Sequence, residues 1–138
     1  ASGVLEVQEQ AVQPVWYKGI AASLYGGFVE EYMTRIFVTT AVVWIISLIR
    51  RAGGNQPVWV YITGIVSGTL LFAAGHLGAA AGVFESSPAL FARTMVLNVL
   101  PGLVFGTLYW RRGILSAVVS HLTVDLIIHA AIPALGLF

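Results

Sequence analysis

The chain has 138 residues, of which 58% are hydrophobic and only 9% are charged, and its net charge is +1. Soluble domains carry about 25% charged residues, so this composition indicates a membrane protein. The near-neutral charge offers no basic surface for nucleic acid, and the absence of cysteine excludes disulfides and thiolate metal sites.

The N-terminal part of the sequence is polar before it becomes apolar. Residues 1–14 form a polar lead-in without the basic patch and apolar core of a cleavable signal peptide. Residues 15–25 are apolar and carry Trp, Tyr and Lys at positions 16–18, residue types that anchor helices at the headgroup level. This stretch predicts an interfacial helix, and the glycine pair at 26–27 predicts a bend after it.

Apolar spans of about the length needed to cross a bilayer follow at residues 28–49, 57–77, 90–110 and 114–132. The third span contains Pro101, which predicts a kink. It also contains Gly102 and Gly106, whose Gly-x-x-x-Gly spacing lets a neighbouring helix approach closely. The sequence therefore predicts an all-α, polytopic membrane bundle of about four transmembrane helices plus an N-terminal interfacial helix, with residues 15–138 forming one domain.

Arginine pairs at 50–51 and 111–112 end the first and third spans and so lie on one side of the membrane. The positive-inside rule makes that side cytoplasmic.

Ionisable residues occur in or beside these apolar spans, where a charge costs at least about 2.5 to 3.5 kcal/mol, and this predicts a functional site. Glu31 and Arg35 are four residues apart, a spacing that favours an ion pair, so we expect Glu31 to be structural and Glu30 to act as a general base. The spacing of His121, Asp125 and His129 places all three on one helix face, where His129 is expected to hydrogen-bond between helices.

The depth of these residues can be estimated from a helical rise of about 1.5 Å per residue. Glu30 then lies about 30 Å from the arginine pair that ends its span, and His76 lies about 28 Å from the start of its own antiparallel span, so the two share a level. His121 and Asp125 lie only about 14 and 20 Å from the second arginine pair, which predicts that they are deeper. A tilted or kinked helix is needed to bring all four together.

Peptide hydrolysis in a bilayer needs a base that holds water and donors that stabilise the oxyanion. Glu30 with His76 can supply the first requirement, and His121 with Asp125 the second. The same four side chains are ordinary zinc ligands, so the residues also allow a divalent metal mechanism.

Three motifs resemble those of the CPBP intramembrane protease family, which includes the type II CAAX prenyl endopeptidases and the bacterial Abi proteins. Residues 30–35, Glu-Glu-Tyr-Met-Thr-Arg, resemble its E-E-x-x-x-R motif. Residues 72–76 resemble its F-x-x-x-H motif, and residues 121–125 resemble its H-x-x-x-N/D motif. The three motifs occur in the order found in the family.

The resemblance implies a glutamate-dependent or metal-dependent intramembrane endopeptidase. Its implied site residues are Glu30, Glu31, Arg35, His76, His121 and Asp125. In the family the first Glu and the second-motif His activate water, and the third-motif His and Asn stabilise the oxyanion. Asp125 stands where the better-characterised members have Asn, and an ionised Asp would repel an oxyanion, which favours the metal reading in which zinc is bound. The family usually has additional spans before the first motif, and this sequence is shorter than we expect for the family.

The implied partners are the lipid bilayer and a peptide or protein substrate, prenylated or inserted in the membrane. We expect an integral, multi-pass protein of a prokaryotic cell membrane. The alternative is a non-catalytic membrane immunity or interaction protein, or a proton-linked carrier that uses the same residues as a relay. A relay predicts polar residues across the full membrane thickness, whereas residues 37–49 and 58–71 lack ionisable groups.

Overall fold

The computed structural model describes residues 16–51 and 53–136, and the polar lead-in predicted for residues 1–14 lies outside them. The described residues form helices and contain no strand. Helices long and apolar enough to cross a membrane occur at Tyr17–Arg50, Val58–Ala81, Pro88–Arg112 and Ile114–Ala134. The prediction of an all-α membrane bundle with four spans is confirmed.

The first span is one continuous helix that includes the segment predicted to lie at the interface. It consists of α1 (Trp16–Tyr25), two π-helical segments (Gly26–Glu30 and Tyr32–Thr39) and α2 (Thr40–Arg50). The glycine pair, where we predicted a bend, lies inside this helix, at the start of the first π-helical segment. A π-helical turn shifts the backbone hydrogen bonds to a spacing of five residues and is frequent at functional sites.

Threonine hydroxyls follow the wider spacing of this helix. Thr39 Oγ1 donates to the carbonyl oxygen of Thr34 at 2.9 Å, and Thr40 Oγ1 donates to that of Arg35 at 3.1 Å. Each bond spans five residues. The side chains thus supply donors to carbonyl groups that a π-helical turn displaces.

The remaining spans lie close to their predicted bounds. They are α3 (Val58–Ala81), α4 (Pro88–Arg112), and a last span made of α5 (Ile114–Leu126), a π-helical segment (Ile127–Ala131) and α6 (Ile132–Ala134). Ser87 caps α4, because its hydroxyl accepts a hydrogen bond from the backbone N–H of Leu90 at 3.1 Å. Gly113 separates α4 from α5 with a φ of 88°, a conformation that favours glycine.

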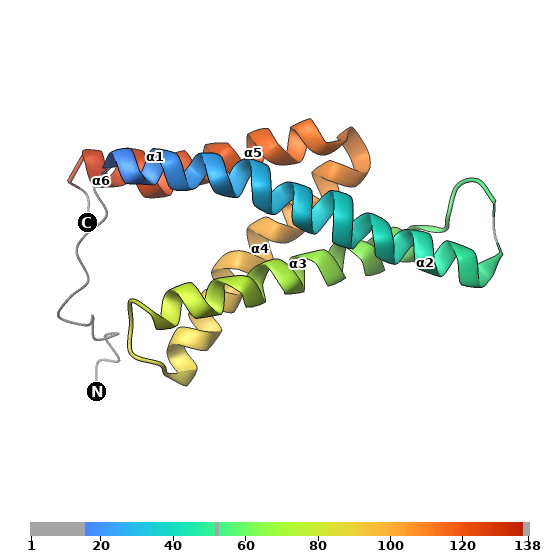
Figure 1. Ribbon diagram of the computed structural model, residues 1–138, viewed down its shortest axis with the longest axis horizontal. Helices are drawn as coiled ribbons and strands as arrows, with labels where there is room; N and C mark the ends of the chain where they lie inside the picture. Colours follow the sequence, from blue (N-terminus) through green and yellow to red (C-terminus); the bar gives the residue numbers. More distant parts are fainter. Residues whose placement is uncertain (1–15, 52, 137–138) are drawn as a thin grey trace.

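The first helix packs against two different partners along its length (Figure 1). Its first part, α1, lies beside α5 and the segment that follows α5, whereas its second part packs on α3. The α3 helix in turn packs along α4. The long first helix thus joins an α1–α5 pair to an α3–α4 pair.

The glycines predicted to lie at a helix contact do so. A β-carbon on Gly106 would lie 2.7 Å from Cγ2 of Ile65, and one on Gly102 would lie 2.9 Å from Cγ2 of Thr69. These distances are shorter than a carbon contact allows, so only glycine lets α4 approach α3 this closely. Pro101 lies inside α4, which continues to Arg112.

Many large apolar side chains of the described residues are exposed, whereas several charged and polar side chains are buried. Large apolar side chains such as Phe37 and Ile49 are exposed, at 73% and 76%. By contrast, the largest fully buried side chains include Arg35 and Glu31. Apolar side chains that face outward suit a lipid surrounding, and the charged pair inside marks the region that the helices enclose.

Candidate active site

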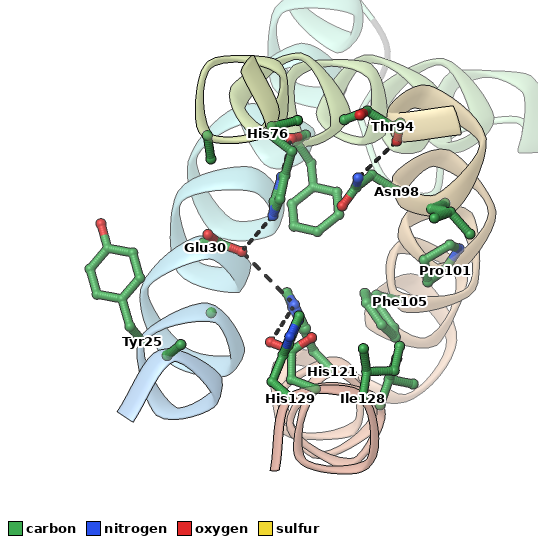
Figure 2. Close-up of a pocket in the computed structure, with 18 of the residues that line it drawn as sticks. Tyr25, Glu30, His76, Thr94, Asn98, Pro101, Phe105, His121, Ile128 and His129 are labelled. Atoms are coloured by element: carbon green, nitrogen blue, oxygen red, sulfur yellow. Dashed lines mark hydrogen bonds and ion pairs between the residues drawn. The ribbon is translucent and has the colours of Figure 1, made fainter. Parts of the chain in front are cut away.

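A cavity of about 550 Å³ lies between the spans, and all four of the described spans line it. Figure 2 shows the side chains that project into it from the first helix, α3, α4 and the last span. Its acidic and basic lining residues are Glu30, His76, Arg93, His121, Asp125 and His129. Four of the six residues that the sequence assigned to the site therefore face one space, while Glu31 and Arg35 lie behind it.

Glu31 and Arg35 form the ion pair that their spacing predicted. Nε of Arg35 lies 3.0 Å from Oε2 of Glu31, and Nη2 lies 3.4 Å from Oε1. Both side chains are fully buried. The guanidinium also lies over the ring of Phe72, with 5.9 Å between Cζ and the ring centroid. The pair therefore has a fixed geometry and no access to the cavity.

His121 is bound to this pair and held between two aromatic rings. Its Nδ1 lies 3.0 Å from Oε1 of Glu31, and since a carboxylate can only accept, Nδ1 carries a proton. The imidazole stacks on Phe105, with ring centroids 4.6 Å apart, and meets the edge of Phe72 at 5.4 Å. The ring is buried and cannot rotate freely. Its Nε2 therefore has a fixed direction.

His76 is oriented by its own helix. Its Nδ1 lies 2.9 Å from the carbonyl oxygen of Phe72, one helical turn earlier, and donates to it. In the neutral ring Nε2 is then the acceptor. Nε2 points into the cavity, and the side chain is 34% exposed.

Glu30 faces both histidines through the same atom. Oε2 of Glu30 lies 3.9 Å from Nε2 of His76 and 3.9 Å from Nε2 of His121, as the dashed lines of Figure 2 show. Oδ2 of Asp125 lies 3.4 Å from Nε2 of His121. A separation of 3.9 Å exceeds a direct hydrogen bond and is a distance that a single bridging water can span.

The predicted difference in depth between Glu30 and His121 is wrong. Glu30 lies about 30 Å along the helix from Arg50, and His121 lies about 14 Å from Arg112, yet their side chains are 3.9 Å apart. The ends of the two helices must therefore be offset by about 16 Å. Figure 1 shows this offset, because α2 and the start of α3 extend beyond the turn between α4 and α5.

Gly26 brings the first helix close to the site, although its sequence position predicted only a bend. A β-carbon on Gly26 would lie 2.8 Å from Oδ2 of Asp125, 3.4 Å from Oε2 of Glu30 and 3.5 Å from Nε2 of His121. Three polar atoms of the site thus converge on the space that the missing side chain leaves. The spacing of four residues between Gly26 and Glu30, one helical turn, was the signal that could have identified it.

Four further residues of interest line the cavity: Asn98, His129, Arg93 and Phe105. Nδ2 of Asn98 donates to the carbonyl oxygen of Thr94 at 2.8 Å. His129 lines the cavity, but within the described residues it makes no hydrogen bond, so the interhelical bond expected for it is not found there. Arg93 and Phe105 also line the cavity, and no pattern in the sequence assigned them to it.

The His, Asp and Glu side chains of the described residues do not fit a divalent metal ion. Across residues 16–51 and 53–136, no group of three or more His, Asp or Glu side chains is placed to hold one. The residues as arranged do not form a metal site, and the steps proposed below use their own acid and base groups.

Comparison with known proteins gave one family. A family model described as "Type II CAAX prenyl endopeptidase Rce1-like" matches residues 12–127, which contain all three motifs and every residue that lines the cavity except Ile128 and His129. No curated protein and no solved structure matched the chain.

Proposed function

The chain belongs to the Rce1-like family of type II CAAX prenyl endopeptidases, and on that premise we propose that Glu30 and His76 activate the water that cleaves the peptide bond. The family makes the protein an integral membrane endopeptidase with a peptide or protein substrate in the membrane. The assignment of each step to a residue is our proposal.

The observation that carries this proposal is the position of Oε2 of Glu30 relative to Nε2 of His76, 3.9 Å away. A water between the two atoms can donate one hydrogen to the carboxylate and the other to the imidazole nitrogen, which leaves its lone pairs directed at a substrate carbonyl. Glu30 is 27% exposed and makes no hydrogen bond with another described side chain. It is therefore free to take the proton.

The reaction then proceeds as acid–base chemistry. Glu30 removes a proton from the water while the water oxygen attacks the carbonyl carbon. The carbon–nitrogen bond of the tetrahedral intermediate breaks as Glu30 returns that proton to the leaving amine nitrogen.

His121 is in a position to stabilise the oxyanion. Because Nδ1 already donates to Glu31, donation from Nε2 requires a ring that carries both protons. A buried Glu31 carboxylate would stabilise the positive charge of such a ring, and its ion pair with Arg35 holds it in place. In this proposal Glu31 and Arg35 act through His121 as positioning residues, and Asp125 is the second oxyanion donor when it is protonated.

The substrate class is proposed only in outline. A prenylated C-terminal tail, a leader peptide and a transmembrane segment all present a peptide bond that this chemistry can cleave. A location in the cell membrane of a prokaryote is part of the same proposal.

The test is Glu30→Gln in the purified protein, with Glu85→Gln as the matched control, because Glu85 is exposed in the loop between α3 and α4. A fluorogenic peptide library in detergent micelles supplies the substrates. We expect the Glu30 variant to lose at least about 100-fold in cleavage rate, the range of a general base, with no change in thermal stability. Equal cleavage by the two variants would show that another group is the base.

A further inference from the structure

Arg93 is the basic residue of the cavity that has no partner. Arg35 pairs with Glu31, and Arg50 and Arg111 lie over the rings of Trp59 and Trp110. In contrast, Arg93 makes no hydrogen bond, ion pair or ring contact with any described residue, although it lines the cavity. Arg93 is exposed and lies near one end of α4, so its guanidinium is accessible to a ligand that enters the cavity.

Arg93 lies at the same level of the bundle as His76. His76 lies five residues before the end of α3 at Ala81, and Arg93 lies five residues after the start of α4 at Pro88. The two helices pack together in opposite directions, so both residues lie about 7.5 Å from the same end. Arg93 therefore belongs to the α4 wall of the cavity, at the height of His76.

Arg93 places a positive charge on the α4 wall of the cavity. The first helix contributes Glu30, whose role as a base requires a carboxylate. A negatively charged group of a substrate is therefore repelled by Glu30 and attracted to α4. Guanidinium groups bind carboxylates with two parallel hydrogen bonds, a geometry that fixes orientation as well as position.

We propose that Arg93 binds a carboxylate of the peptide substrate and thereby orients the peptide across the cavity, with its carboxylate at α4 and its scissile bond at Glu30. The proposal rests on the proposed function, since it names a recognition group of the same site. The carboxylate can be the C-terminus of the peptide or the side chain of an Asp or Glu residue, and the two sources share this chemistry.

The experiment uses one fluorogenic peptide library in detergent micelles, prepared in three forms. The first form ends in a free carboxylate, the second in an amide, and the third in an amide with Asp as its last residue. The parent protein is compared with Arg93→Gln and Arg93→Lys. Arg112→Gln is the matched control, because Arg112 is exposed at the other end of α4 and its side chain has no partner among the described residues.

We expect the parent to cleave a carboxylate-bearing form at least about tenfold faster than the plain amide, expressed as kcat/KM, the size of one charge-assisted contact. Arg93→Gln should abolish this preference mainly through KM, Arg93→Lys should retain part of it, and Arg112→Gln should retain all of it. The first and third forms identify whether the C-terminus or a side chain supplies the group.

Three results would overturn the proposal while leaving the hydrolase assignment intact. One is equal cleavage of all three forms by the parent. Another is a preference that persists in Arg93→Gln. The third is an Arg93→Gln variant that differs from the parent only because its thermal stability no longer responds to vesicles of anionic phospholipid, which would make Arg93 a lipid anchor. Failure of the parent to cleave any form would instead refute the proposed function, and this inference with it.

Discussion

His121 and Glu31 are 90 positions apart in the chain, yet Nδ1 of the histidine lies 3.0 Å from Oε1 of the glutamate, and both side chains are buried. This bond ties the last span to the first helix. It also links the Glu31–Arg35 ion pair to the cavity, because the carboxylate that pairs with Arg35 also binds the imidazole of His121. The hydrogen bond and the ion pair thus join Arg35, Glu31 and His121 into one buried cluster.

Arg35→Ala should destabilise the protein more than any other single arginine substitution. Removal of the guanidinium leaves Glu31 buried with only His121 as partner, and loss of one member of a buried pair costs about 3 to 5 kcal/mol. Thermal unfolding in detergent measures the effect. Arg51→Ala is the control, since Arg51 is exposed, and an equal melting temperature for the two variants would contradict the role of the pair.

The two histidines should separate activity from stability. His76→Ala should lower the cleavage rate by about 100-fold or more and leave the melting temperature unchanged, because His76 is 34% exposed and bonds only within its own helix. His121→Ala should lower both quantities, since it removes a buried partner of Glu31, at a cost of about 1 to 3 kcal/mol. Parallel measurements of rate and unfolding on both variants test this. A large stability loss in the His76 variant would disprove the distinction.

Gly26→Ala should lower activity without unfolding the protein. Its β-carbon would occupy the space on which Asp125, Glu30 and His121 converge, and small displacements of reacting groups cost about 100-fold in rate. Alanine is intrinsically better than glycine in a helix, so a purely structural effect should not be large. Gly75→Ala is the control, because nothing lies within 4 Å of a β-carbon there, although Gly75 adjoins His76. Similar rates for the two alanine variants would show that the space is not used.

The sequence alone predicts the features that depend on residue spacing within one helix. The bounds of the three later spans, the Glu31–Arg35 pair and the packing role of Gly102 and Gly106 follow from runs and spacings within one helix, and the structure contains all of them. Residues close in sequence share a helix face, so their relation is fixed before the helices pack.

Features that depend on how helices are offset could not be obtained in this way. Depth counted from Arg50 and Arg112 assumed that the two helix ends are level, whereas tertiary packing offsets them by about 16 Å. The widening of the first helix after Tyr25 and the placement of Arg93 in the cavity also depend on neighbouring spans. Each of these changes a distance between helices, which no spacing within one helix records.

Asp125→Asn should keep or raise activity if the site works without a metal. Oδ2 of Asp125 lies 3.4 Å from Nε2 of His121, on the side where the oxyanion is expected, and only a protonated Asp can donate there. An Asn amide always carries its donor, so the variant should remain active at higher pH than the parent. The measurement is cleavage rate against pH for the parent, Asp125→Asn and Asp125→Ala.

The same variants, assayed with and without a chelator, decide between the two chemistries that the residue types allow. In the acid–base mechanism the chelator has no effect, the Asn variant is active, and the Ala variant loses activity because it has no donor. If Asp125 were an anionic metal ligand, the amide would bind the ion more weakly, the parent would lose activity in chelator, and added zinc would restore it. Because no group of three or more His, Asp or Glu side chains in the described residues is placed to hold a metal ion, we expect the first outcome.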